Sequence, residues 1–393
     1  LLVVALSVPG YNRSGGDYWI YTLLGILARR HQVTLLALYP HPPQEQEEYQ
    51  KAIEQLGVEV VVGLRQRSLK DLLARGYDAA ILEFYYVSEM IADDIRFYQP
   101  QLPIAIDTHD VHFLREARMA QVLNDAQMLA ESETTRRREL AAYRKADLLI
   151  VRTPYETQAL LHQEASFEIF TAPVMFAVRG ESLPEKRQPN SLLFVGWFKH
   201  PPNVDGLLYF CDEILPLVKK ALPEVRLTVV GGDAPPEIQA LSSETVRLTG
   251  RVESVTPYLD SHRVAIAPLR YGAGMKTKVI ESLASGVPTV TTSVGAEGIG
   301  LVHGRHAFIA DTPDEFAQAI VRLCQDDELW RQVSVASRRF VEQHCSLEVA
   351  ERQIEVLVER LTHLRPKRLT LVEKLPIYRR KAWAKAAALL RRH

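Results

Sequence analysis

Two lysines and a glutamate lie at the start of a predicted helix, directly after a loop that contains Gly272 and Gly274. Lys276 and Lys278 fall in the first turn of that helix, and Glu281 lies three residues beyond Lys278. Because the amino end of a helix carries about half a positive charge, ammonium groups there are disfavoured by some tenths of a kcal/mol. A bound phosphate would relieve that repulsion, since free backbone N–H groups and a glycine loop can also approach it. The pattern predicts a phosphate site, with Glu281 accepting hydrogen bonds from the hydroxyls of an attached ribose.

A second interpretation of the same segment is a solvated helix start. In it, Lys278 and Glu281 form a surface ion pair, which contributes little to stability. Phosphate binding and this ion pair are both compatible with the segment taken alone.

The segment 104–112 places two histidines and two carboxylates at or just past a predicted buried strand. At the carboxyl end of that strand, His109 is expected to face the space between domains and to hydrogen-bond a substrate hydroxyl, with Asp110 orienting it. One alternative is a metal site built from Asp107, His109 and His112, although their spacing does not fix a ligand geometry. Another alternative is a histidine that only caps or packs.

Glycines follow several predicted strands. In the second half they are Gly196, Gly231, Gly250 and Gly272. Glycines in these places would line one rim of a parallel sheet, where a nucleotide can lie, and the neighbouring Arg251 is expected to contact the base. Gly15 and Gly16 follow the first predicted strand of the chain and put backbone N–H groups at the end of its sheet. Neither a G-x-G-x-x-G fingerprint after a first strand nor a P-loop is present, which argues against a nicotinamide enzyme and a P-loop NTPase.

The composition is that of a soluble globular protein of about two domains, with 393 residues and a net charge of -1. Without a basic excess, nucleic acid is not expected as a partner. Three cysteines exclude a disulfide framework and a zinc site, so a reducing, cytoplasmic compartment is expected. No apolar run approaches the length of a membrane span. Because it starts at Leu1 without a methionine, the chain is expected to be a trimmed or partial product.

Alternating strand and helix patterns predict an α/β protein with two doubly wound, Rossmann-like domains. In the first domain, strands are predicted at 1–8, 32–38, 58–63, 78–84, 103–107 and 147–152. In the second they are predicted at 191–195, 226–230, 246–250, 264–269, 289–292 and 307–311. The longest predicted helix, 114–145, is expected to be solvated and to pack by one stripe. The predicted organisation is a first domain 1–177, a linker 178–190, a second domain 191–345, a terminal helix 346–365 returning to the first domain, and a tail 366–393.

The tail is basic and amphipathic. Its cations, which alternate with Trp383, alanines and leucines, are Arg379, Arg380, Lys381, Lys385, Arg391 and Arg392. Such a helix can lie on an anionic membrane surface, which would place the protein at the cytoplasmic face of a membrane. The alternatives are a solvated tail and the start of a further segment.

From about Ser191 to Leu361, the sequence resembles the retaining glycosyltransferases of family 4, which have the two-domain GT-B fold with a cleft between the domains. The run from Gly272 to Thr292, followed by Gly295-Ala-Glu-Gly, is similar to their donor-site signature. The run Phe194-Val-Gly-Trp-Phe, with Pro202-Asn203, resembles the start of the same domain in one subgroup.

This resemblance implies roles for several residues. Glu281 would hold the ribose, and Lys278 with Lys276 would neutralise the diphosphate. His109 would lie near the donor sugar, and the loop with Gly15 and Gly16 would close over the phosphates. The implied reaction moves a sugar from a nucleotide diphosphate to a hydroxyl of a glycan, lipid-linked sugar or cell-surface polysaccharide, with retention and with no essential metal or cofactor.

Two positions depart from the family pattern. Ala273 stands where many members have a second glutamate that contacts the sugar, so either backbone N–H groups of the glycine loop bind the sugar or the activity is altered. An arginine often found soon after the position of Gly196 is absent, and Lys199 is the nearest cation. A nucleotide-sugar epimerase and a non-catalytic binding protein of the same architecture are therefore kept as alternatives.

Overall fold

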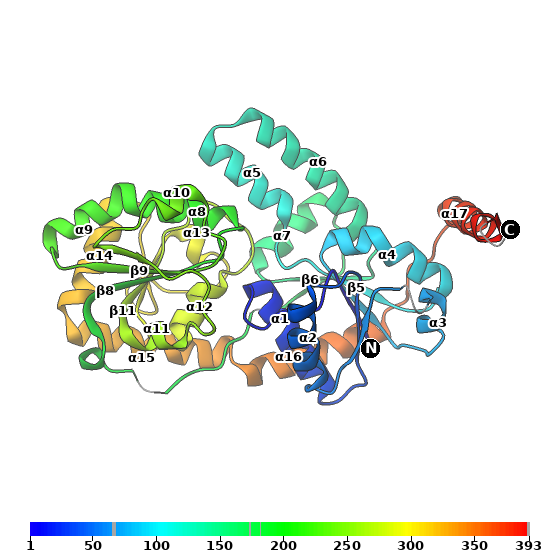
Figure 1. Ribbon diagram of the computed structural model, residues 1–393, viewed down its shortest axis with the longest axis horizontal. Helices are drawn as coiled ribbons and strands as arrows, with labels where there is room; N and C mark the ends of the chain where they lie inside the picture. The colour runs from blue at the N-terminus through cyan, green and yellow to red at the C-terminus, as the bar shows by residue number, and fades with distance from the viewer. Residues whose placement is uncertain (65–67, 173, 181, 391–393) are drawn as a thin grey trace.

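The computed structural model describes residues 1–64, 68–172, 174–180 and 182–390, with side chains described as far as residue 381. Within these residues the chain forms two α/β domains, each built on one parallel sheet flanked by helices (Figure 1). The expected pair of Rossmann-like domains is therefore confirmed.

The sheet of the first domain has seven strands in the order β3-β2-β1-β4-β5-β6-β7. Its strands are β1 (Leu2–Ala5), β2 (Thr34–Ala37), β3 (Glu59–Val62), β4 (Ala80–Glu83), β5 (Ile104–Asp107), β6 (Leu148–Val151) and β7 (Ile169–Thr171). Its helices are α1 (Gly15–Ala28), α2 (Pro43–Glu54), α3 (Leu69–Leu73), α4 (Tyr85–Tyr98), α5 (His112–Leu123), α6 (Ala126–Tyr143) and α7 (Pro154–Gln163). The short strand β7 was not predicted from the sequence.

The sheet of the second domain has six strands in the order β10-β9-β8-β11-β12-β13. Its strands are β8 (Gln188–Val195), β9 (Arg226–Val230), β10 (Val246–Leu248), β11 (His262–Ala267), β12 (Thr289–Thr291) and β13 (Phe308–Ile309). The helices from here to the end of the described chain are α8 (Pro201–Tyr209), α9 (Leu215–Ala221), α10 (Pro236–Gln239), α11 (Thr256–Ser261), α12 (Thr277–Ala284), α13 (Ser293–Ala296), α14 (Pro313–Gln325), α15 (Asp327–His344), α16 (Leu347–His363) and α17 (Leu371–Leu390). A short 3₁₀ turn, η1 (Pro184–Lys186), precedes β8, and a π-helical turn, η2 (Phe210–Ile214), joins α8 to α9.

Burial on both faces explains why the strands are almost continuously apolar in sequence. In β1, Leu2 and Val4 pack into one hydrophobic cluster, while Val3 and Ala5 pack into another on the opposite face. Successive side chains of a strand point to opposite faces, so each face needs its own cover of helices. All four side chains are buried.

The strand order of each sheet reverses once, and the predicted glycine loops lie at these reversals. In the first sheet β1 lies between β2 and β4, and in the second sheet β8 lies between β9 and β11. The loop with Gly15 and Gly16 follows β1, and the loop with Gly272 and Gly274 follows β11. The carboxyl ends of strands at such a switch point are where open α/β sheets bind ligands.

The predicted single helix 114–145 is wrong, because the chain folds there into the hairpin of α5 and α6, which stand side by side in Figure 1. Asn124 ends α5 in the left-handed conformation, with φ of 52°, and Asp125 caps the start of α6 through the backbone N–H groups of Gln127 and Met128. Asparagine and aspartate favour these two positions. Nor is the segment only solvated, since the buried Glu139 accepts hydrogen bonds from the first backbone N–H groups of α5.

The last residues of the predicted linker 178–190 belong to the second sheet. Strand β8 begins at Gln188, which pairs in register with His262 of β11. The preceding Arg187 is buried and donates hydrogen bonds to Ser182 and to the carbonyls of Leu259 and His262. An arginine can lie in a core when polar partners surround it. The charge of Arg187 alone did not indicate that this residue is buried.

Helix α16 crosses back from the second domain and packs against α1 of the first (Figure 1). Its buried Ile354 and Leu357 share a hydrophobic cluster with Leu23 and Leu27 of α1. Ion pairs on the rim of this contact join Arg29 to Glu351 and Arg30 to Glu355. This contact ties the end of the chain to its beginning.

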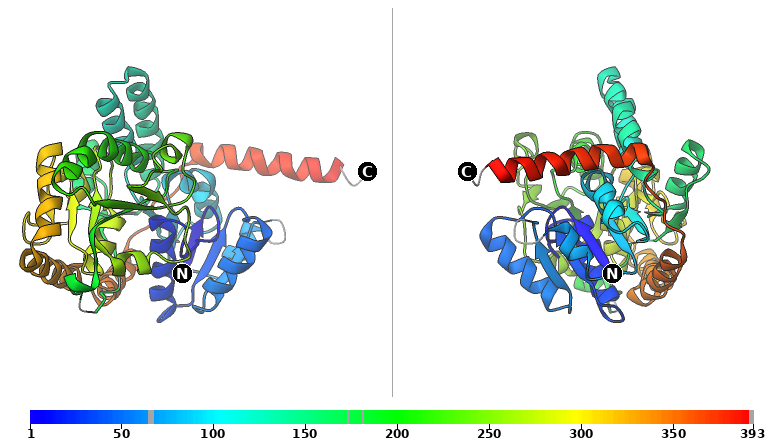
Figure 2. Two further views of the ribbon diagram at one scale, coloured as in Figure 1. Left: turned by 60° about the vertical axis from the view of Figure 1, so that its left-hand side comes forward. Right: turned by 90° about the vertical axis from the view of Figure 1, so that its right-hand side faces the viewer.

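Helix α17 extends away from the body of the protein (Figure 2). Among the described residues, no helix is both long and apolar enough to cross a membrane. The segment before α17 is fixed to the first domain, because the backbone N–H of Lys367 donates to Asp147 and its carbonyl accepts from Arg96.

Candidate nucleotide-binding site between the domains

The glycine loops of the two domains meet. A Cβ placed on Gly15, the first residue of α1, would lie 2.5 Å from Oγ1 of Thr277, the first residue of α12. A Cβ on Gly274 would lie 3.0 Å from the carbonyl oxygen of His109. Gly274 also has a φ of 66°, which favours glycine. The starts of α1 and α12 and the loop after β5 therefore form one site between the domains, which we call the interdomain site.

Both predicted lysines lie in this site, where Lys276 is buried and Lys278 is half-buried. Lys276 is 8% exposed, and its Nζ donates to the carbonyls of Ala273 (3.2 Å) and Gly274 (2.6 Å). The Nζ of Lys278 donates to Oδ1 of Asn203 and lies 4.7 Å from the ring centroid of Phe194. Burial lowers the pKa of Lys276 to about 8 and that of Lys278 to about 7.

The surface ion pair between Lys278 and Glu281 is not formed. Among the ion pairs of the described residues, neither Lys276 nor Lys278 is paired with a carboxylate. Taking an ammonium group out of water costs free energy unless an opposite charge lies close. Two such groups side by side therefore favour the binding of an anion.

Glu281 complements the lysines as an unpartnered carboxyl group. Its side chain makes no hydrogen bond or ion pair within the described part of the chain, and burial raises its pKa to about 7. Glu281 lies near the phenol of Tyr18 of α1, whose ring stacks on Phe176 with centroids 5.1 Å apart. Titratable groups shifted by burial and left without partners are typical of ligand-binding sites.

Gly196 and Gly231 leave space for Asn203, the residue that holds Lys278. A Cβ on Gly231 would overlap the carbonyl oxygen of Gly196, and a Cβ on Gly196 would lie 2.9 Å from Cγ of Asn203. Asn203 in turn donates to the carbonyl of Trp197 over 2.7 Å and accepts from Lys278. The two glycines thus make room for the amide that holds the lysine.

Two other predicted donor-binding residues lie elsewhere in the structure. The side chain of Lys199 is 62% exposed, and its Nζ lies 3.7 Å from Asp233, so it faces solvent. The guanidinium of Arg251 donates to Tyr49 Oη over 2.6 Å and to Asn12 over 3.1 Å. Arg251 therefore links the two domains in this conformation, instead of lying free for a base.

His109 lies in the interdomain site as predicted, but Asp110 does not orient it. The Nε2 of His109 is hydrogen-bonded to Glu83, at the end of β4. Asp110 pairs instead with Arg115 and lies 3.3 Å from Nδ1 of His112. These partners are close because α5 begins at His112, so that its first turn brings Arg115 and His112 to the carboxylate of Asp110.

The metal alternative takes a different form in the structure. Glu83, Asp107 and His109 have ligand atoms within 4.8 Å of one another, and His112 is not among them. Both oxygens of Asp107 already have partners, since one accepts from Arg152 and the other from Trp19 Nε1 over 2.8 Å. A guanidinium therefore supplies positive charge to this cluster, so its donor set does not fit a resident metal ion.

Sequence reasoning missed Arg118, on a helix interpreted as solvated. Its guanidinium reaches across the interface and donates to the carbonyl of Gly272 over 2.6 Å and to both oxygens of Glu297 over 2.7 and 2.8 Å. Such a two-pronged pair fixes direction as well as distance. Glu297 belongs to the quoted run Gly295-Ala-Glu-Gly. Its place in that run was the one sequence feature that could have indicated a partner for this carboxylate.

Together, the two facing Rossmann-like domains give the protein the GT-B fold. The match of residues 189–326 to the family described as Glycosyl transferases group 1 identifies the second domain as a member of that family.

Comparisons with other proteins support this class. The chain is 25% identical over 163 residues to an uncharacterised protein of the cps region of Klebsiella pneumoniae, in a match that covers 39% of this chain and 42% of that relative. Sucrose-phosphate synthase from Thermosynechococcus elongatus superposes with a TM-score of 0.70 at 17% identity, over 92% of this chain and 98% of the other. HepE from Anabaena, solved with UDP and glucose, has a TM-score of 0.64 at 14% identity, over 91% and 98%. At such identities the structural matches show the shared fold.

Proposed function

We propose that this protein is a retaining glycosyltransferase that moves a sugar from a nucleotide diphosphate to an acceptor hydroxyl. The observation that carries the proposal is the group formed by Lys276, Lys278 and Glu281 beside the glycine loops. One ammonium group is buried and one is half-buried, and among the described residues the carboxyl group has no hydrogen-bond or ion-pair partner. A diphosphate matches the lysines and a ribose matches the carboxylate. The membership of the second domain in a glycosyl transferase family supports the same function.

The reaction follows from where charge develops. The bond between the sugar C1 and the diphosphate oxygen breaks, the acceptor oxygen bonds to C1, and the acceptor proton passes to the leaving diphosphate. Lys276 and Lys278 would stabilise the negative charge that grows on the diphosphate. Gly15 and Gly16 would add backbone N–H groups at the start of α1. No step requires a metal.

For the donor, we propose a uridine diphosphate sugar, because the similarly folded HepE binds UDP and UDP-glucose. For the acceptor, we propose a hydroxyl of a cell-surface polysaccharide or its lipid-linked precursor, held mainly by the first domain. The relative from a cps region supports this choice. We place the reaction on the cytoplasmic side of a membrane.

Product analysis tests the reaction type. The protein is incubated with UDP-glucose or UDP-N-acetylglucosamine labelled in the sugar, together with a membrane extract as the source of acceptor. Transfer predicts label in acceptor and stoichiometric release of UDP. An epimerised sugar nucleotide would establish the epimerase instead, and UDP binding without turnover of any donor would establish a binding protein.

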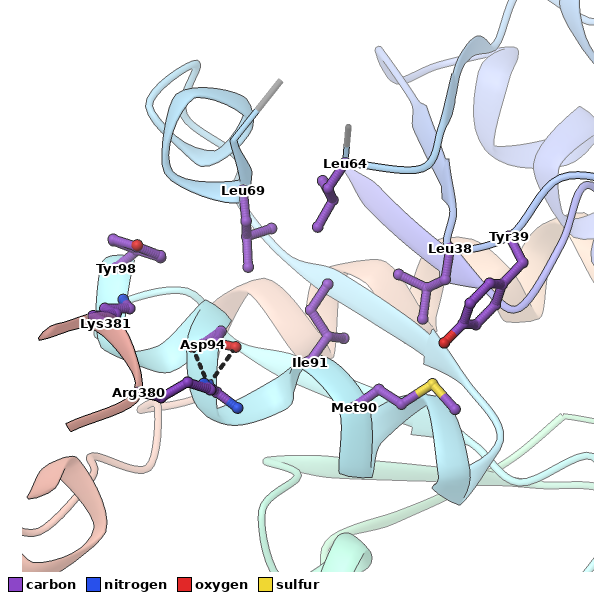
Figure 3. A pocket seen from close by; sticks show the side chains of 10 residues that line it. All are labelled: Leu38, Tyr39, Leu64, Leu69, Met90, Ile91, Asp94, Tyr98, Arg380 and Lys381. Carbon is purple, nitrogen blue, oxygen red and sulfur yellow. Dashed lines mark hydrogen bonds and ion pairs between the residues drawn. The ribbon is translucent and has the colours of Figure 1, made fainter. Parts of the chain in front are cut away.

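The tail helix supplies an apolar surface for membrane contact. Leu371 is 82% exposed and Leu375 is 53% exposed, and Val372 and Tyr378 are exposed beside them. Figure 3 shows how α17 meets α4 at one end of an open groove of about 450 Å³, lined in part by leucines. There Arg380 forms two hydrogen bonds of 2.7 Å with Asp94. Exposed apolar side chains on a basic helix favour an anionic lipid surface.

We expect Leu371→Glu/Leu375→Glu to weaken co-sedimentation with vesicles that contain phosphatidylglycerol, because the change removes apolar area and adds like charge. The matched control is Val356→Glu, an equally exposed apolar residue of α16 at 53%. Nucleotide binding should not change in either variant. Equal vesicle binding by all three proteins would mean that α17 is only a solvated end.

A variant that lacks α17 should be truncated after Thr370, because Lys367 contacts Asp147 and Arg96 of the first domain.

A further inference from the structure

Two buried carboxylates lie side by side at the ends of neighbouring strands. Glu83 ends β4, Asp107 ends β5, and the two residues are partners in register. Both side chains are fully buried, and like charges directly opposite each other are destabilising. Asp107 is balanced by Arg152 and by the indole N–H of Trp19. Among the described residues, Glu83 has only the imidazole of His109 on one oxygen, and its Oε1 has no hydrogen-bond partner.

The ring of His109 is held in one orientation. Its backbone is left-handed, with φ of 57°, and its N–H donates to Asp107 Oδ1 over 3.1 Å. The imidazole stacks on Phe84 with centroids 4.0 Å apart and planes 16° apart. Phe84 is itself left-handed, with φ of 67°. Two such residues at adjacent strand ends cost free energy, which is common where a side chain must point in one direction for function.

This orientation gives the two ring nitrogens different surroundings. Nε2 points into the first domain, toward Glu83. Nδ1 points toward the start of α1, since a Cβ on Gly16 would lie 3.3 Å from it. A histidine whose one nitrogen donates to a carboxylate presents the lone pair of the other nitrogen outward.

We propose that Glu83 is a positioning residue that keeps the imidazole proton of His109 on Nε2, so that Nδ1 accepts a hydrogen bond from a hydroxyl of the ligand at the start of α1. This inference rests on the proposed function for the identity of the ligand. Its structural part, the placement of the proton, stands without it.

The surrounding charges favour this arrangement above neutral pH. The groups that face the pair are Asp107 on β5, Arg152 directly after β6, Asp17 on α1 and Tyr86 on α4. Burial, with added repulsion from Asp107, raises the pKa of Glu83 to about 7. Below that pH the carboxyl group takes up a proton and can donate to Nε2, which moves the imidazole proton to Nδ1. The Glu83 carboxylate that accepts from Nε2 should therefore be present above about pH 7 and lost below it.

The test is nuclear magnetic resonance of the full chain labelled with ¹⁵N histidine, in which the nitrogen shifts report the tautomer of each ring. The spectrum of His109→Ala assigns the His109 signals. At about pH 8 the wild-type protein should show His109 with its proton on Nε2, whereas Glu83→Gln should populate the form protonated on Nδ1. The control is Glu89→Gln, which changes an α4 glutamate paired with Arg138 on the surface. A wild-type His109 protonated on Nδ1, or an unchanged tautomer in Glu83→Gln, would overturn the inference.

A kinetic measurement complements the spectrum. Glu83→Gln should lower kcat by roughly 10- to 100-fold, as is typical when a residue that orients a functional histidine is changed. The KM for the donor should stay within about twofold, because the lysines and Glu281 that bind the nucleotide are unchanged. The acid limb of the wild-type pH profile should be weaker in the variant. A purely structural role would instead lower the thermal stability and leave the pH profile unaltered, which would count against the inference. Failure of the wild-type protein to bind UDP would defeat the proposed function without changing the tautomer result.

Discussion

Replacing Lys278 by alanine is expected to weaken UDP binding by about 10- to 100-fold, because a hydrogen bond to a charged group contributes about 1.5–3 kcal/mol. Calorimetric titration with UDP measures this change. The ligand-free variant should be no less stable to heat than the wild-type protein. Lys278 is a half-buried ammonium group that lies against Phe194 and Asn203 and has no carboxylate partner in the described part of the chain, so its removal relieves a cost of desolvation.

Lost binding with retained stability is the signature of a site that is strained for the sake of its ligand. Lys220→Ala is the matched control, because Lys220 is an exposed lysine of α9 in the same domain. Its UDP affinity should equal that of the wild-type protein. If Lys278→Ala binds UDP as tightly as Lys220→Ala does, the assignment of the diphosphate to this helix start is wrong.

The pH dependence of binding follows from the same groups. Lys278 has a pKa of about 7 in the free protein, so above that pH it must take up a proton when the diphosphate binds, and affinity falls. Glu281 also has a pKa of about 7, so below that pH it must lose a proton before it can accept hydrogen bonds from ribose, and affinity falls again. UDP affinity should therefore be highest near neutral pH. In Lys278→Ala, the fall of UDP affinity at alkaline pH should be smaller. The titration of UDP itself affects both proteins equally and so cancels in the comparison.

The stability of the ligand-free protein should show the opposite influence of Lys278. Its folded-state pKa is lowered by burial, so between about pH 7 and 10 the unfolded chain binds more protons than the folded chain. This group therefore makes the folded state more stable as pH rises through that window. The thermal stabilities of the wild-type and Lys278→Ala proteins, measured across this pH window, should approach each other toward its alkaline end.

The second domain shows which structural features the local sequence pattern predicts. Strand β9 matches its predicted bounds, and the two lysines lie at the start of α12, because glycine loops, apolar strands and helix starts leave clear signals over a few neighbouring residues. Within this reach, the charge order of Lys276 and Lys278 predicted a phosphate site, which stays a prediction.

Partners that are distant along the chain were not predicted. Glu83 lies 26 residues before His109, and Arg118 lies 179 residues before Glu297. Only the register of β4 with β5 and the contact between domains bring these pairs together. The sequence placed Asp110 beside His109 because it is adjacent in the chain, yet α5 turns that carboxylate toward Arg115. Adjacency in sequence is a poor guide to contact where a strand ends and a helix begins.

Replacing Glu281 by alanine should remove the preference of the protein for a ribonucleotide. We expect the wild-type protein to bind UDP about tenfold or more tightly than 2′-deoxy-UDP, since a half-buried carboxylate that accepts from a hydroxyl loses that hydrogen bond when the hydroxyl is absent. In Glu281→Ala, the two nucleotides should bind with nearly equal affinity. The difference between nucleotides, measured by calorimetry, isolates the ribose contact from any general loss of binding.

Glu342→Ala, which changes an exposed glutamate of α15, serves as the control and should keep the wild-type preference. Glu281→Gln separates charge from shape, because an amide oxygen still accepts a hydrogen bond but does not titrate. This variant should retain part of the preference for UDP and lose the fall in affinity below about pH 7. An unchanged preference in Glu281→Ala would remove the ribose from this helix and leave the lysines as a site for phosphate alone. That result would separate the two halves of the proposed nucleotide site, which the group of three side chains otherwise joins.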